Sequence, residues 1–143
     1  MSKSCVQIVF AVMGMFLSLL AAGCTSVAAD VGEKAYTHLR GDLLAVVPDS
    51  LEEVYPAAVA AMESLEGYDV AEKNLNVIGG LVVAYDEQAR KVRIELSKTE
   101  NNQTAISIRI GAVGDKVESV RIYDSIQYYL RQNRTSKGVQ YVL

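Results

Sequence analysis

The residues VRIELSKTENNQTAISIRI, Val92–Ile110, decide the fold of this chain. Apolar residues alternate with polar or small residues on both sides of a polar turn at Lys98–Gln103. A period of two is typical of antiparallel strands that bury one face and leave the other in water. The stretch therefore predicts a β-hairpin whose core face carries Val92, Ile94, Leu96, Ile106, Ile108 and Ile110.

Three further strands are predicted before this hairpin. Tyr36–Val47 reads as one strand, in which Gly41 marks a bulge. Tyr68–Lys73 and Val77–Tyr85 read as two more, joined by a turn at Asn74–Asn76. With the hairpin, they predict an antiparallel sheet of four to five strands.

Two helices are predicted from their start signals. Ser50–Glu53 has the capping-box pattern, an apolar stripe follows it, and Gly67 ends the helix. Pro56 removes a backbone donor, so the helix either kinks there or begins there. Asp115–Glu118 is a second capping box, and the helix behind it is predicted to run to about Asn133.

The element order is strand, helix, four strands, helix, which predicts an α+β fold in two layers. The sheet forms one layer and both helices pack on one of its faces. The domain is expected to span residues 36–133, with 134–143 as a tail. Within the tail, Val139–Leu143 either frays or adds an edge strand.

The N-terminal residues have the pattern of an export signal. Lys3 precedes an apolar run, Val6–Ala22, which ends in Leu-Ala-Ala-Gly before Cys24. Small residues suit the shallow pockets of a signal peptidase, and a cysteine thiol is nucleophilic enough to accept a lipid. We expect a signal peptide over residues 1–23, lipidation of Cys24 and a tether over 24–35. The alternative is an uncleaved membrane helix, for which this run has about the minimum length.

This segment resembles the lipobox of bacterial lipoproteins, with Ala21 where leucine is usual. In lipoproteins of bacteria with two membranes, aspartate after the lipidated cysteine commonly retains the protein at the inner membrane. Thr25 therefore favours the outer membrane, with the domain facing the periplasm.

Charge and cysteine content exclude several classes of function. Without Lys3 the chain has 13 basic and 17 acidic residues, a net charge of −4, which gives no general attraction for nucleic acid. Attachment to a membrane would then rest on acyl chains at Cys24. Cys5 would leave with the signal, so no free thiol remains for a disulfide or a thiolate metal site. No cofactor is expected.

The mature domain also resembles a family of small bacterial lipoproteins known only as a domain of unknown function. The residues that carry the resemblance span roughly Tyr36–Leu130: Gly41-Asp42-Leu43, Ser50–Tyr55, Ala61 with Leu65, Ile106–Gly111, and Gly114-Asp115 followed by Ser119, Ile122 and Ile126. The resemblance implies an export signal, a lipid anchor and a compact α+β domain. It implies no activity and no catalytic residues.

Few residues suggest chemistry. His38 is the only histidine and has no metal-ligating neighbours at suitable spacing. Gly111–Lys116 faintly resembles a phosphate-binding loop, but it is two residues short and Asp115 would repel phosphate. The acidic pairs, such as Asp86-Glu87, fall in turns or a first helical turn, where solvation is expected. Tyr123 and Tyr128 are the candidate partner contacts, on the expectation that both are partly exposed.

The sequence therefore favours a membrane-anchored, non-enzymatic module that contacts another component of the cell envelope. A second hypothesis is a module that binds lipid or a small molecule in a cavity between the helices and the sheet. That cavity would be lined by Leu43, Met62, Ile94 and Ile108.

Overall fold

The computed structural model describes residues 36–139. The chain divides after Glu33, and every described residue lies in the second part. This part has an antiparallel sheet and two helices, which confirms the predicted α+β class, although the sheet has six strands. The elements are β1 (Tyr36–Leu39), β2 (Asp42–Val47), α2 (Leu51–Ser64), β3 (Tyr68–Leu75), β4 (Gly79–Asp86), β5 (Lys91–Lys98), β6 (Thr104–Ile110) and α3 (Lys116–Val139).

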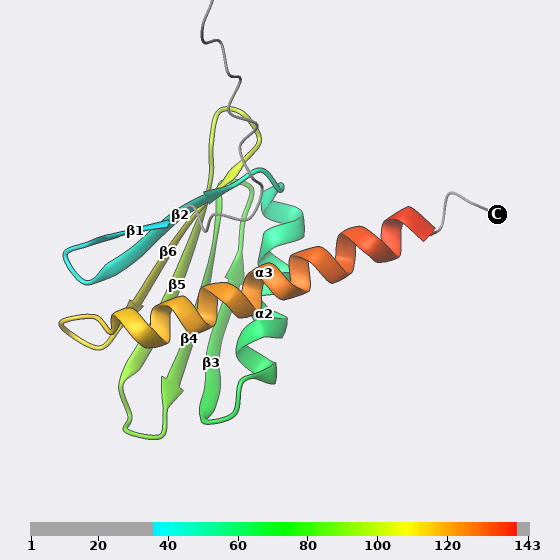
Figure 1. Cartoon of the computed structure of the whole chain (residues 1–143). Helices are drawn as coiled ribbons and strands as arrows, with labels where there is room; N and C mark the ends of the chain where they lie inside the picture. The colour runs from blue at the N-terminus through cyan, green and yellow to red at the C-terminus, as the bar shows by residue number, and fades with distance from the viewer. Residues whose placement is uncertain (1–35, 140–143) are drawn as a thin grey trace, which may run out of the picture. The chain divides into compact units, whose positions relative to one another are not determined.

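The strands lie in the order β1-β2-β6-β5-β4-β3, and every neighbouring pair is antiparallel. The two helices pack against each other and against one face of the sheet (Figure 1). α3 contacts β2 and β6, whereas α2 contacts β3, β4 and β5. Within residues 36–139 the other face of the sheet has no helix on it, so this part of the chain has two layers.

The predicted alternation on β5 and β6 is confirmed. Ile94 pairs with Ile108 and Leu96 with Ile106, and all four side chains are buried beneath the helices. Glu95 and Ser107 pair on the opposite face of the same strands. At about 25 cal/mol for each Å² of apolar surface removed from water, such rows are the main stabilising contribution to the fold.

The prediction of a single strand over Tyr36–Val47 was wrong, because the chain folds back there as the β1–β2 hairpin. Leu39 pairs with Asp42, so Arg40 and Gly41 form a two-residue turn. Both have positive φ, +52° and +91°, as a turn that matches the twist of the flanking strands requires. Gly41 is thus a turn residue rather than a bulge, and this hairpin supplies the additional strand.

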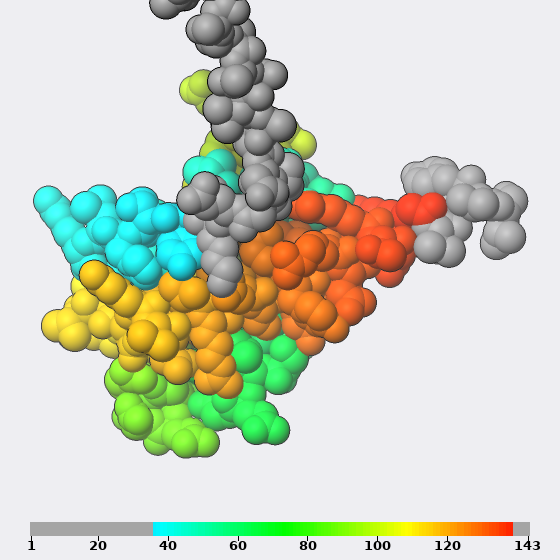
Figure 2. All heavy atoms as spheres, in the orientation of Figure 1, coloured from blue at the N-terminus to red at the C-terminus, as the bar shows by residue number. Residues whose placement is uncertain are grey.

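The two helices begin as predicted, but α3 ends later. The Ser50 amide and hydroxyl both donate to Glu53 Oε2, at 3.3 and 3.2 Å, and α2 starts at Leu51 and continues through Pro56. α3 runs to Val139, beyond the predicted limit at Asn133, so residues 134–139 are helical and do not form a tail or a strand. Its last turns extend past the sheet (Figure 2).

The β3–β4 turn also lies later than predicted. β3 continues to Leu75 and β4 begins at Gly79, so Val77 and Ile78 lie in the turn rather than in a strand. Asn76 explains the shift, because its Oδ1 accepts from the Ile78 and Gly79 amides at 3.0 and 2.9 Å. Such an asparagine side chain closes a turn locally.

Candidate functional site

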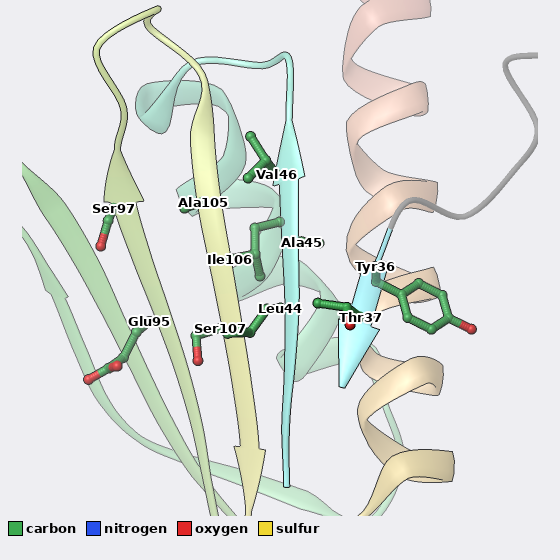
Figure 3. A pocket seen from close by; sticks show the side chains of 10 residues that line it. All are labelled: Tyr36, Thr37, Leu44, Ala45, Val46, Glu95, Ser97, Ala105, Ile106 and Ser107. Atoms are coloured by element: carbon green, nitrogen blue, oxygen red, sulfur yellow. The ribbon is translucent and has the colours of Figure 1, made fainter. Parts of the chain in front are cut away.

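A groove of about 650 Å³ lies on the helix-free face of the sheet (Figure 3). The bottom of the groove is formed by small side chains, Ala105 and Ser107 on β6 and Ser97 on β5. Leu44 and the half-exposed Val46 form an apolar wall on β2. The residues that line the groove are Tyr36, Thr37, Leu44, Ala45, Val46, Glu95, Ser97, Ala105, Ile106 and Ser107.

The groove combines an apolar wall with a few polar groups. The polar groups of its lining residues are the hydroxyls of Tyr36, Thr37, Ser97 and Ser107, and the carboxylate of Glu95, which pairs with Arg93. No imidazole lies among its lining residues. An apolar wall with a few hydroxyls is typical of a surface that binds an apolar or amphipathic partner.

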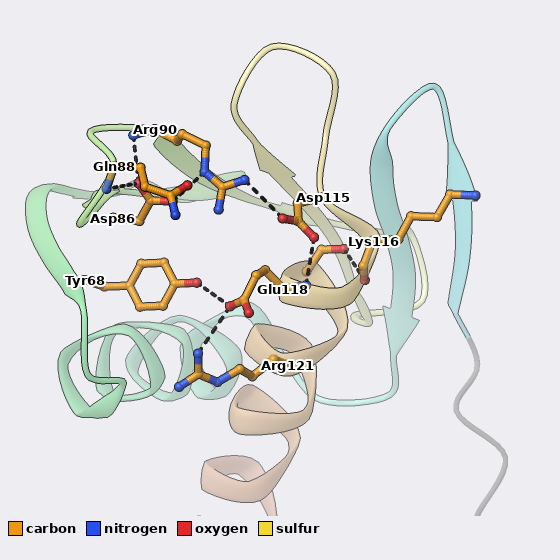
Figure 4. A network of polar contacts seen from close by, with 9 residues as sticks. Tyr68, Asp86, Gln88, Arg90, Asp115, Lys116, Glu118 and Arg121 are labelled. Carbon is orange, nitrogen blue, oxygen red and sulfur yellow. Dashed lines mark hydrogen bonds and ion pairs between the residues drawn. The ribbon is translucent and has the colours of Figure 1, made fainter.

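A second group of polar residues joins three elements at one end of the sheet (Figure 4). Arg90, in the β4–β5 turn, donates to Asp86 at 2.7 Å and to Asp115 at 3.1 Å. The Tyr68 hydroxyl donates to Glu118 Oε2 at 2.7 Å, linking β3 to the first turn of α3. Asp115 also accepts from the Glu118 amide at 3.2 Å and so caps α3.

The electrostatics of this network indicate a structural role. Burial, followed by the hydrogen bond to Glu118, raises the pKa of Tyr68 to about 12. The Glu118 amide and then the Arg90 guanidinium hold the pKa of Asp115 below its usual value. Desolvation raises the pKa of Asp86, but hydrogen bonds from Arg90 and Gln88 outweigh it and leave that pKa lowered. The carboxylates therefore stay ionised near neutral pH and Tyr68 keeps its proton, so none of the three is poised to exchange protons.

A third polar cluster holds the corner where the β1–β2 turn meets the β6–α3 loop. Arg109 donates to Asp42 Oδ1 at 2.8 Å, to the Arg40 carbonyl at 3.3 Å and to the Ala112 carbonyl at 2.6 Å. The two backbones approach so closely that a Cβ on Gly41 would lie 2.1 Å from the Val113 carbonyl oxygen. Asp42, Arg109 and Asp115, which belong to the resembling segments, thus lie in structural contacts.

The structure does not unite the other sequence candidates in a site. His38 lies on β1 with its ring 5.7 Å from that of Tyr36, and its buried Nδ1 has no hydrogen-bond partner among the described residues. In the Gly111–Lys116 loop, Asp115 caps the helix and pairs with Arg90. Residues 36–139 contain no group of three potential metal ligands.

The expectation that Tyr123 and Tyr128 are both partly exposed was wrong for Tyr123. Tyr123 is only 4% exposed, because its ring packs edge-on against that of Tyr36 at 5.5 Å. Tyr128 is 51% exposed and its hydroxyl accepts from Gln132 Nε2 at 2.6 Å. Only Tyr128 therefore remains a candidate surface contact on α3.

The proposed cavity between helices and sheet is filled by its own residues. Leu43, Met62, Ile94 and Ile108 are all 0% exposed and belong to the packed core. The groove lies on the opposite face, and the sequence did not reveal it because it depends on which strands are neighbours. The small residues Ser97, Ala105 and Ser107 on neighbouring predicted strands were the signal available in the sequence.

The N-terminal predictions concern residues outside the described range. Cys24, the signal over 1–23 and the tether over 24–35 lie there, as do residues 140–143 of the predicted tail. Within residues 36–139, neither helix is long and apolar enough to cross a membrane.

Comparison with protein families matches residues 6–128 to the family described as protein of unknown function (DUF3568). The chain belongs to the DUF3568 family. The matched range includes all strands of the sheet, α2 and the first half of α3, and also the apolar run before Cys24. No curated protein matches the chain.

Proposed function

We propose that this DUF3568 member is a lipid-anchored, non-enzymatic module of the cell envelope. The observation that carries the proposal is the sequence from Val6 to Cys24, an apolar run that ends in three small residues and a cysteine. The family match begins at residue 6, so this segment belongs to the pattern that the family shares. Two or three acyl chains, at about 0.8 kcal/mol for each buried methylene, would hold the protein on a membrane.

The absence of an assembled catalytic set supports a non-enzymatic role for the described domain. Asp42 and Asp115 each pair with an arginine, and His38 lies outside the lining of the groove. The helix-free face instead offers a continuous surface for a partner. We propose that another envelope component binds there, against Leu44 and Val46.

Cell fractionation tests the anchor and its location. The wild-type chain should sediment with outer membranes and be released by detergent, whereas Cys24→Ser should not gain the lipid and should lose this attachment. Thr25→Asp should move the protein to the inner membrane without changing its amount. Equal release of wild type and Cys24→Ser by a salt wash would contradict the proposal.

The groove also favours a second candidate function, binding of a small apolar or amphipathic molecule. Its volume of about 650 Å³ lies within the range of known ligand sites. A ligand that binds the folded state raises the melting temperature. A panel of lipids and metabolites should therefore stabilise the wild type but not Ser107→Trp, in which the indole fills the groove. No stabilisation by any compound would remove this candidate.

A further inference from the structure

The β3–β4 turn exposes two adjacent branched apolar side chains. Val77 is 85% exposed and Ile78 is 73% exposed, with Leu75 beside them at 46%. Asn74–Tyr85, the segment around this turn, contains no charged residue. Turns usually contain glycine, asparagine, aspartate or serine, and branched residues are poor turn formers, so the turn geometry does not account for Val77 and Ile78.

The backbone of this turn is prepared for an environment with little water. The Ile78 and Gly79 amides donate to Asn76 Oδ1, and the Asn76 amide donates to the Gly79 carbonyl at 2.9 Å. The Ile78 carbonyl accepts from the Lys98 amide at 3.0 Å. In lipid, a backbone group that lacks a partner is costly, and these bonds supply partners within the protein.

The register of the sheet places this turn at the same end as Tyr36, the first described residue. One row of paired residues crosses five neighbouring strands: Tyr36, Ala45, Ile106, Leu96 and Gly80. Four strand spacings separate Tyr36 from Gly80, about 20 Å. Val77 and Ile78 lie in the turn before Gly80, so they are at the same end of the sheet as Tyr36, the first residue of β1.

The length of the N-terminal segment permits contact between this end and a membrane. Only eleven residues lie between Cys24 and Tyr36, a span of at most about 40 Å when fully extended. A lipid on Cys24 therefore keeps the turn close to the bilayer surface, and this high local concentration allows even a small apolar contact to form.

We propose that the Val77-Ile78 turn inserts into the lipid surface and orients the domain on the membrane. This inference rests on the lipid anchor at Cys24. The turn supplies a second, weaker contact, by which the two side chains leave water for the boundary between headgroups and acyl chains. The opposite end of the sheet, where Val113 lies in the β6–α3 loop, then faces away from the membrane.

Val113 provides a matched control for the experiment. It is a valine with 86% exposure, and it lies at the other end of the strands. We would label Val77→Cys or Val113→Cys with an environment-sensitive fluorophore in the full-length protein purified from membranes. The labelled protein would be reconstituted with vesicles of phosphatidylethanolamine and phosphatidylglycerol that carry a nitroxide quencher on the acyl chains. Flotation would then show whether the protein stays attached.

The expected result is quenching several-fold stronger at position 77 than at position 113, with both proteins floating with the vesicles. Ile78→Asp, added to the position-77 variant, should reduce the quenching while leaving the melting temperature unchanged. Equal quenching at the two positions, or stronger quenching at 113, in protein that floats would overturn the inserted turn and leave the anchor intact. Protein that fails to float would overturn both.

Discussion

Gly41 occupies a backbone position that other residues would strain. Its φ is +91°, and an added Cβ would meet the Val113 carbonyl oxygen at 2.1 Å, a backbone atom that has little freedom to move. We predict that Gly41→Ala lowers the free energy of unfolding by about 2–4 kcal/mol. Urea denaturation followed by circular dichroism measures this change.

Gly138→Ala is the control for that substitution. Gly138 lies in α3 with nothing within 4 Å of an added Cβ. Because alanine favours a helix over glycine, the variant should be unchanged or more stable, by at most about 1 kcal/mol. Wild-type stability of Gly41→Ala would mean that the β1–β2 turn does not approach the β6–α3 loop as described.

At the scale of the elements, two contacts join the last turns of α3 to the start of α2: Lys137 Nζ donates to Glu53 Oε1 at 2.6 Å, and Arg134 pairs with Asp49. Arg134 Nε donates to Asp49 Oδ1 at 2.8 Å, and a second bond joins Arg134 Nη2 to Asp49 Oδ2. Asp49 is buried, whereas the Arg134 side chain is half exposed, so the pair stabilises by about 1 kcal/mol. We predict that Arg134→Ala speeds hydrogen exchange at the amides of residues 134–138.

Arg131→Ala, an exposed position one turn earlier, should leave that exchange near the wild-type rate. Equal exchange in the wild type and in Arg134→Ala would show that the helix end does not depend on Asp49.

The network of Asp86, Arg90 and Asp115 predicts a loss of stability in acid. The pKa values of Asp86 and Asp115 are lowered on folding, so their contribution is complete above the unfolded value near 3.8 and is lost as pH falls through the folded values. Stability should therefore fall below about pH 4. Asp115→Asn should lose less stability between pH 7 and pH 3 than the wild type, measured as the urea midpoint. Asp69→Asn, at an exposed position on β3, should follow the wild-type profile.

The elements that sequence predicts well are those with a local pattern. Val92–Ile110 alternates on both sides of its polar turn, and its strands and turn are found where expected. The β1–β2 hairpin was missed because arginine at the first turn position is a weak signal compared with asparagine or aspartate. The end of α3 was missed because residues 131–138 have no apolar stripe, and the partner that holds Arg134 is 85 residues away in the sequence.

At the scale of the whole molecule, stability rests on the single apolar layer between sheet and helices. Ile108 lies at its centre, with 0% exposure and Leu43 and Ile94 as its paired neighbours. We predict that Ile108→Ala costs about 3–4 kcal/mol, within the range for large-to-small changes in a core. Val113→Ala, at an exposed position, should cost less than about 0.5 kcal/mol. Similar melting temperatures for the two variants would contradict this description of the core.

The candidate site was less predictable than the fold. The groove forms because β6, which carries Ala105 and Ser107, lies between β2 and β5. This strand order follows from long-range pairing rather than from local sequence. Tyr123 was misplaced for a related reason, since its burial depends on Tyr36 of β1. The proposed anchor is different, because the residues around Cys24 carry their own signal.

Mass spectrometry of the protein isolated from membranes tests the anchor most directly. The account predicts an N-terminus at Cys24 that carries the mass of acyl chains, and loss of that mass in Cys24→Ser. An intact N-terminus at Met1 without acyl mass would contradict the account and would favour a membrane helix over Val6–Ala22.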